Sequence, residues 1–89
     1  MPIYQIQFTR TAKKELDALS DGMAERIVAA IGRLEQDPRG AGTKKLKAFG
    51  GRWRLRVGDF RVVYLINDEG RVIIISIIQH RSANQSALG

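Results

Sequence analysis

Residues 52–66 constrain the fold of this chain more than any other part of its sequence. They read Arg-Trp-Arg-Leu-Arg-Val, then Gly-Asp, then Phe-Arg-Val-Val-Tyr-Leu-Ile. Alternation of this kind is typical of strands with one buried face, and a two-residue connection that begins with glycine predicts a tight hairpin. In that hairpin Val57 faces Phe60 and Arg56 faces Arg61, so one side is apolar and the other is basic.

Two helices are expected before the hairpin. Thr9 is placed to cap a short helix, and Ser20 or Asp21 caps a second helix that ends at Asp37-Pro38. Apolar residues recur along both helices at three- and four-residue steps, which predicts one stripe that packs on a sheet. The stripe consists of Ala12, Leu16, Leu19, Ala24, Ile27, Val28, Ile31 and Leu34.

The other segments predict two further strands and a loop. Residues 3–8 alternate in polarity and form an opening strand, whereas residues 39–51 hold four glycines and are expected to form a loop. A turn at residues 67–70 leads into a last strand over residues 71–79. A four-residue turn there places two pairs side by side on the last two strands, Arg61 with Ser76 and Phe60 with Ile77.

These elements predict a single α+β domain, residues 1–89, in the order β-α-α-β-β-β. An antiparallel β-sheet packs on an N-terminal helical hairpin, and 89 residues leave no room for a second core. Strand alternation divides the side chains of the hairpin and last strand between two faces. The core face holds Trp53, Leu55, Val57, Phe60, Val62, Tyr64, Ile73, Ile75 and Ile77. The opposite face holds Arg52, Arg54, Arg56, Arg61, Ser76 and His80, with Val63, Leu65, Val72 and Ile74 at its other end.

The net charge of +6 is concentrated in one segment. Residues 39–61 hold eight basic residues and one acidic residue, so they carry +7 while the rest of the chain sums to −1. Such concentration is typical of a surface that binds a polyanion, although a basic surplus can also serve solubility alone. Lys44, Lys45, Lys47 and Arg52 are candidate contacts to RNA.

Arginines that face each other across strands predict an anionic ligand. Like charges in directly opposed positions destabilise a sheet, whereas planar guanidinium groups bind phosphate oxygens well. The alternative is that Arg54, Arg56 and Arg61 only keep the sheet soluble. His80, the only histidine, is expected on the same face, where it could transfer a proton near neutral pH.

With one histidine and no cysteine the chain offers no ligand set for a transition metal, so neither a metal nor another cofactor is expected. RNA can supply its own nucleophile, the 2′-hydroxyl, and needs from the protein mainly positioning and charge stabilisation. The basic face therefore suits metal-independent cleavage of RNA better than cleavage of DNA.

The chain resembles the RelE/ParE superfamily of toxins from bacterial toxin–antitoxin modules. The resemblance spans nearly the whole sequence and is strongest in residues 53–64 together with His80-Arg81. It also includes the Thr-x-x-Ala-x-x-x-Leu pattern at Thr9, the Asp37-Pro38 pair and Lys45-Leu46. It implies a RelE-like fold and a ribosome-dependent endoribonuclease that cleaves messenger RNA and inhibits translation.

The resemblance also implies roles for single residues. Arg61 and Arg81 would hold the scissile phosphate, Arg54 and Arg56 would stabilise the developing charge, and His80 would protonate the leaving 5′-oxygen. One departure is that Gln85 stands where many relatives carry a tyrosine that contacts the substrate nucleotide. This departure leaves two alternatives open, a ParE-like DNA gyrase inhibitor that acts by binding and a basic nucleic-acid-binding domain without catalysis.

The family further implies a cognate, RelB-like antitoxin whose acidic or amphipathic segment wraps the toxin in a hetero-oligomer. The arginines and the apolar end of their face offer such a segment both kinds of contact. Uncharged runs are too short to cross a bilayer, and the first residues do not form a signal peptide, so a cytoplasmic protein without membrane contact is expected.

Overall fold

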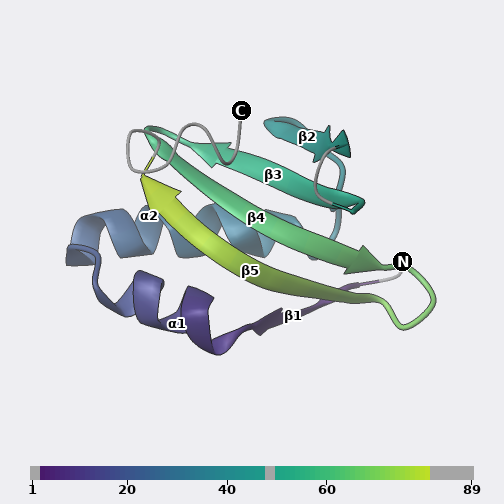
Figure 1. Cartoon of the computed structure of the whole chain (residues 1–89), viewed down its shortest axis with the longest axis horizontal. Helices are drawn as coiled ribbons and strands as arrows, with labels where there is room; N and C mark the ends of the chain where they lie inside the picture. The colour runs from purple at the N-terminus through teal and green to yellow at the C-terminus, as the bar shows by residue number, and fades with distance from the viewer. Residues whose placement is uncertain (1–2, 48–49, 81–89) are drawn as a thin grey trace.

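A computed structural model, which describes residues 3–47 and 50–80, has two helices on one side of a five-stranded sheet (Figure 1). The elements follow the chain as β1 (Gln5–Phe8), α1 (Arg10–Asp17), α2 (Asp21–Arg33), β2 (Thr43–Leu46), β3 (Arg52–Val57), β4 (Phe60–Asn67) and β5 (Val72–His80). The strand order is β1-β5-β4-β3-β2. The predicted α+β fold is therefore confirmed.

Both predicted helix caps are present. The side chains of Thr9 and Ser20 accept hydrogen bonds from the main-chain N–H groups of Ala12 and Met23, which satisfies donors that a helix start leaves free. Two details differ from expectation. The second helix ends at Arg33, ahead of the Asp37-Pro38 pair, and Val28 is 50% exposed because it lies beside the buried stripe of α2.

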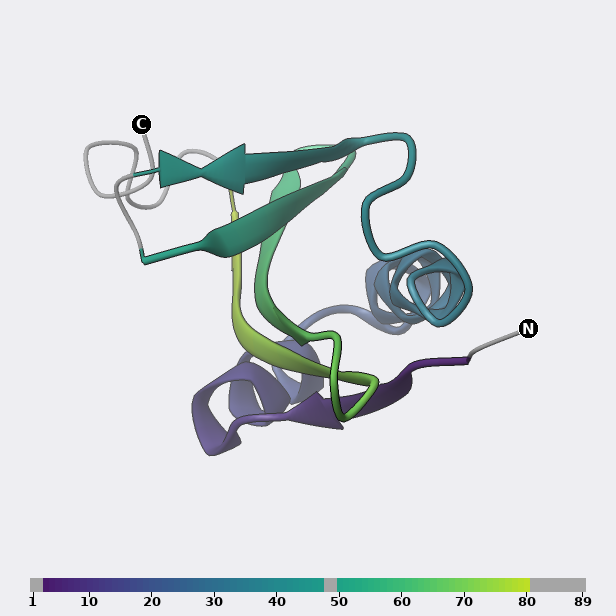
Figure 2. The same ribbon diagram turned by 90° about the vertical axis from the view of Figure 1, so that its right-hand side faces the viewer.

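The sheet is mixed and not wholly antiparallel as predicted, because β1 runs parallel to β5 while the other neighbours are antiparallel. Residues 39–51 were expected to form only a loop, and this was wrong, since β2 lies within them. Thr43 to Leu46 pair with Leu55 to Arg52 and occupy the outer edge of β3, as Figure 2 shows in a view nearly along α2. Two exposed lysines, Lys44 and Lys45, lie on this edge strand, where charge discourages pairing with another chain.

The register of β3 on β4 is the predicted one, from Trp53 opposite Tyr64 to Val57 opposite Phe60. The register of β4 on β5 differs from the predicted one. The turn starts and ends one residue later, so Asn67 pairs with Val72 and each partner on β5 moves by two residues. A bulge between Val63 and Tyr64 moves the partners of residues 60–63 by one more. Arg61 consequently lies beside Gln79 and Phe60 beside His80.

The core lies between the helices and the inner face of the sheet. It is formed by residues at most 8% exposed: Ala12, Ile27, Ala30, Ile31, Leu34, Leu55, Val57, Val62, Tyr64, Ile73, Ile75 and Ile78. Because of the bulge, Ile78 replaces the expected Ile77 in this set. Trp53 and Phe60, also predicted for the core face, are only partly buried and pack against this core, as do Leu16 and Leu19 from the helical stripe, whereas Ala24 is not part of it. The Tyr64 hydroxyl donates a hydrogen bond of 2.6 Å to the Pro38 carbonyl. Burial raises the pKa of Tyr64 to about 12.

Candidate nucleic-acid interface

Five basic residues share the sheet surface that faces away from the helices, and we call this surface the basic face. Arg56 lies directly opposite Arg61 on β3 and β4, and Lys44 lies directly opposite Arg54 on β2 and β3. Directly opposed residues in an antiparallel pair point to the same side, with Cα atoms about 4.5–5.5 Å apart. The basic face thus comprises Lys44, Arg52, Arg54, Arg56 and Arg61.

The arginines of the basic face repel one another. Burial lowers the pKa of the Arg54 guanidinium, and the positive charges of Arg61 and Arg56 lower it further. A lowered pKa means that the folded state disfavours the charged form of this group. Over residues 3–47 and 50–80 the ion pairs are Lys13 with Asp17 and Arg39 with Asp68, and neither includes Arg54, Arg56 or Arg61.

Arg61 holds the polar atom that most clearly lacks a partner. Its Nη1 atom is buried, yet no hydrogen-bond acceptor reaches it from the part of the chain that the structure describes. Burying a donor without an acceptor costs about 1–3 kcal/mol, and more when the donor is charged. The arrangement therefore favours an anion with several oxygen atoms, such as a phosphodiester, at this position.

His80 lies on the other side of the sheet from the one expected. It pairs with Phe60, whose side chain packs on the core, and the two rings meet edge to face with centroids 5.1 Å apart. The expectation that His80 shares the basic face is wrong, because it assumed uninterrupted alternation along β5. The imidazole is exposed at the end of β5, next to the hairpin that carries Arg56 and Arg61.

Gln79 is the residue of β5 that shares the basic face, and the sequence analysis missed it. It lies directly opposite Arg61, which completes a row of three side chains across the sheet, Gln79, Arg61 and Arg56. The sequence held one signal for this shift. Ile77 and Ile78 follow Ser76 as two consecutive apolar residues, so alternation could not decide which of them is buried.

Helix α1 and its N-cap residue Thr9 form hydrogen bonds with the displaced end of β5. The Thr9 hydroxyl donates to the Ser76 carbonyl at 3.0 Å, and the main-chain N–H of Ile78 donates to Glu15 Oε1 at 2.7 Å. Strand β1 pairs with β5 only as far as Ile75. These two side chains thus supply hydrogen bonds to the edge of β5 beyond the end of β1.

The remaining predicted contacts are distributed differently. Lys45 pairs with Trp53 and lies on the side of the sheet opposite to Lys44, so the two lysines do not act on one surface. Lys47 is exposed just after β2. Arg81 and Gln85 lie outside the described residues.

The apolar end of the outer face is present as expected. Val63 is 1% exposed although it lies outside the core between the helices and the sheet, and four partly buried residues accompany it: Leu65, Val72, Ile74 and Ile77. Val63 pairs with Arg54 on one side and with Ile77 on the other. Apolar and cationic surfaces are therefore continuous on this face.

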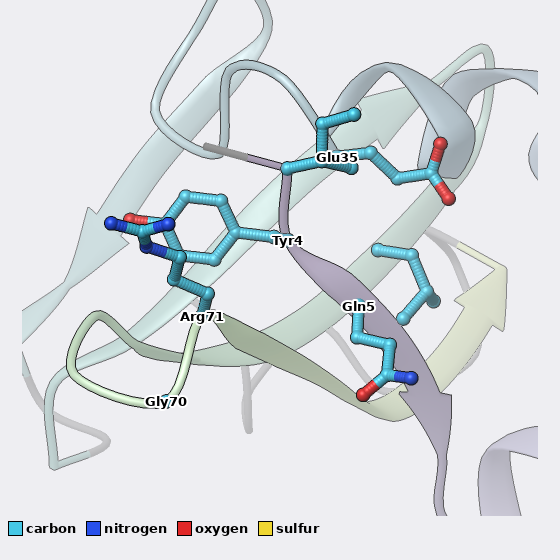
Figure 3. Close-up of a pocket in the computed structure, with 7 residues that line it drawn as sticks. Tyr4, Gln5, Glu35, Gly70 and Arg71 are labelled. Carbon is cyan, nitrogen blue, oxygen red and sulfur yellow. The ribbon is translucent and has the colours of Figure 1, made fainter. Parts of the chain in front are cut away.

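A hollow of about 510 Å³ lies at the other end of the sheet, beside the start of β1 (Figure 3). Ile3, Tyr4, Glu35 and Arg71 are among the residues that line it, and none of the predicted site residues reaches it. Among the described residues there is no group of three or more potential metal ligands. Nor does any helix within them have the length and hydrophobicity to cross a bilayer.

Comparison with known proteins gives one consistent result. A family model for the ParE toxin of the type II toxin–antitoxin system parDE matches residues 6–84. Toxin RelG of Mycobacterium tuberculosis is 30% identical over 80 residues, which span 89% of this chain and 92% of RelG.

Two solved structures extend the likeness to the fold. One is the RelE–RelB complex of Pyrococcus horikoshii OT3, with a TM-score of 0.79, 27% identity, and coverage of 93% of this chain and 99% of that one. The other is the toxin–antitoxin complex RelBE2 of Mycobacterium tuberculosis, with a TM-score of 0.78, 31% identity, and coverage of 89% and 99%.

Proposed function

The chain belongs to the RelE/ParE family of toxins from type II toxin–antitoxin systems, and on this premise we propose that it is a ribosome-dependent endoribonuclease. Its substrate is messenger RNA, and cleavage of the message inhibits translation. The observation that carries this proposal is the cluster of arginines on the basic face. Arg54, Arg56 and Arg61 converge there without an acidic partner among the described residues, and one buried guanidinium nitrogen has no acceptor.

The proposed reaction uses basic side chains of the protein and a hydroxyl group of the substrate. The 2′-hydroxyl of RNA attacks the neighbouring phosphorus and expels the 5′-oxygen, so negative charge develops on the phosphate oxygens. Arg61 and Arg81 hold the scissile phosphate, while Arg54 and Arg56 stabilise the added charge. Lys44, Lys45, Lys47, Arg52 and Gln85 contribute further contacts to RNA.

His80 is proposed as the acid that protonates the leaving 5′-oxygen. A protonated imidazole can donate a proton to an oxygen, and this exposed imidazole lies at the end of β5 beside the arginine hairpin. The imidazole ring lies on the Phe60 side of the sheet. The bound RNA must therefore extend around the end of the sheet, so that its 5′-oxygen lies close to the ring. General acid catalysis contributes about 10²- to 10⁴-fold, so His80→Ala should slow cleavage by that factor. Equal cleavage rates for the wild-type chain and His80→Ala would show that His80 is not the acid.

The test of the function is a reconstituted translation reaction programmed with a defined message. The wild-type chain should cut the message on the ribosome, and Arg61→Gln should lower the rate by at least about 10²-fold through lost charge stabilisation. Arg10→Gln is the matched control, because Arg10 is an exposed arginine at the start of α1, on the helix side. An intact message in the presence of the wild-type chain would refute the nuclease.

A second candidate is supported by the family model, which describes ParE toxins and spans residues 6–84. In this case the chain inhibits DNA gyrase by binding, without cleavage of RNA. A supercoiling assay run beside the translation assay separates the two functions. Failed supercoiling with an intact message supports the gyrase inhibitor, whereas a cut message with normal supercoiling supports the nuclease.

The proposed partner is a RelB-like antitoxin. Two of the related toxins were solved in complexes with their antitoxins. On this chain an acidic, amphipathic segment would place carboxylates against the basic face and apolar side chains against the partly buried apolar residues that surround Val63. Co-expression with the adjacent open reading frame should yield a hetero-oligomer that dissociates more readily at high salt. Purification of the chain alone in that experiment would contradict this partner.

A further inference from the structure

The row formed by Gln79, Arg61 and Arg56 combines one amide with two guanidinium groups. Guanidinium groups only donate hydrogen bonds, and so does the ammonium group of Lys44 nearby. A phosphodiester offers only acceptors, so these three cationic donor groups suit a phosphate. The carboxamide of Gln79 differs, because its Oε1 atom accepts hydrogen bonds.

The position of Gln79 brings this acceptor next to the phosphate site. Neighbouring strands lie about 4.8 Å apart, so Gln79 and Arg61 reach over adjacent parts of one nucleotide. Gln79 is half-buried, and no hydrogen bond of its side chain to another described residue is present. The group closest to a ribonucleotide phosphate that can donate a hydrogen bond is the 2′-hydroxyl, which DNA lacks.

The geometry points to Gln79 as the residue that distinguishes ribose from deoxyribose on the basic face, through a hydrogen bond from the 2′-hydroxyl to Oε1. This inference rests on the proposed function, because it assigns the sugar that accompanies the phosphate held by Arg61. An amide is not a base at neutral pH, so Gln79 binds and orients the hydroxyl and does not remove its proton. The role belongs to Gln79 only because the bulge in β5 turns His80 to the other side.

The test measures binding of the full-length chain to three uridine oligonucleotides of equal length, with ribose, 2′-deoxyribose or 2′-fluororibose sugars. The fluorinated sugar keeps a ribose-like pucker but cannot donate a hydrogen bond. The wild-type chain should bind the ribose form about threefold to tenfold more tightly than either of the others, which is the range for one neutral hydrogen bond. Gln79→Met should remove this preference and leave the affinity for the deoxyribose form unchanged.

Gln7→Met is the matched control. Gln7 is an exposed amide on β1 that pairs with Ile74, away from the arginine hairpin, so its loss should keep the ribose preference. The inference is overturned if Gln79→Met keeps the preference, if it weakens all three ligands equally, or if the wild-type chain binds the ribose and fluororibose forms alike. Failure to cut messages would instead refute the nuclease and leave this binding difference intact.

Discussion

Arginines at the two ends of the sheet have opposite surroundings. At the β4–β5 turn, Arg39 donates to both carboxylate oxygens of Asp68, at 3.2 and 2.8 Å, and lies 5.5 Å from the ring centroid of Trp53. The Tyr4 hydroxyl donates to the same carboxylate at 2.6 Å. At the β3–β4 hairpin, Arg56 and Arg61 face each other, and no ion pair to either comes from the part of the chain that the structure describes.

This difference separates charges that are paired within the fold from charges that we propose bind a ligand. The contacts among Arg39, Asp68 and Tyr4 connect the segment after α2, the β4–β5 turn and the residue that precedes β1. The basic face does the reverse, because opposed like charges on a sheet cost about 0.2–1 kcal/mol. Departures from local stability rules are expected at functional sites, and here the departure is confined to one end of the sheet.

The largest expected effect comes from charge reversal at Arg56, which should change stability and ligand affinity in opposite directions. In Arg56→Glu a carboxylate faces Arg61, so stability should rise by about 0.5 kcal/mol while affinity for the ribose oligonucleotide falls by about tenfold or more. Denaturant unfolding and fluorescence anisotropy measure the two quantities. Arg10→Glu changes the net charge equally at the start of α1 and should leave the affinity within about twofold. Parallel loss of stability and affinity in Arg56→Glu would show that the arginines serve the fold.

Removing Arg39 should have the converse effect. Arg39→Gln deletes the contact with Asp68 and the cation–π contact with Trp53, so Tm should fall by about 3–6 °C. Oligonucleotide affinity should stay within about twofold, because Arg39 lies at the other end of β4 from Arg61. A tenfold loss of affinity would place Arg39 within the binding surface and erase the distinction between the two ends.

The sequence predicted the arginine hairpin because its register depends on local information. A two-residue turn at Gly58-Asp59 leaves one pairing, and Gly58 has a φ of +57°, a conformation that glycine adopts without strain. The opposition of Arg56 and Arg61 follows from it. The helix caps at Thr9 and Ser20 could also be predicted, since each cap forms its hydrogen bond within the first turn of its own helix.

The sequence could not predict the end of β5, because its register depends on contacts distant in the chain. The bulge is held by Thr9 and Glu15, which lie more than sixty residues before their partners Ser76 and Ile78. Since alternation has a period of two, one extra residue moved His80 off the basic face and brought Gln79 onto it. Strand β2 was not predicted for a similar reason. Its short polar sequence forms a strand only because it pairs with β3.

The smallest predicted effect concerns the pH dependence of the paired end of the sheet. Hydrogen bonds from Arg39 and Tyr4 lower the pKa of the Asp68 carboxyl below its ordinary value of 3.8. A carboxyl group with a depressed folded-state pKa stabilises the fold above its unfolded-state pKa, and this contribution is lost as the pH falls through the folded-state value. Asp68→Asn should therefore melt below the wild-type chain at pH 7, and the difference in Tm should narrow as the pH falls below 3.8.

Arg39→Gln provides the comparison for this measurement, because Arg39 is the largest cause of the shift at Asp68. Its own difference in Tm from the wild-type chain should also narrow in acid, since protonated Asp68 no longer attracts the guanidinium. Asp68→Asn should leave oligonucleotide affinity unchanged at pH 7. A difference in Tm that stays constant from pH 7 down to about pH 2 would mean that Asp68 is not held as a carboxylate by its neighbours, and the paired end would lose its electrostatic role.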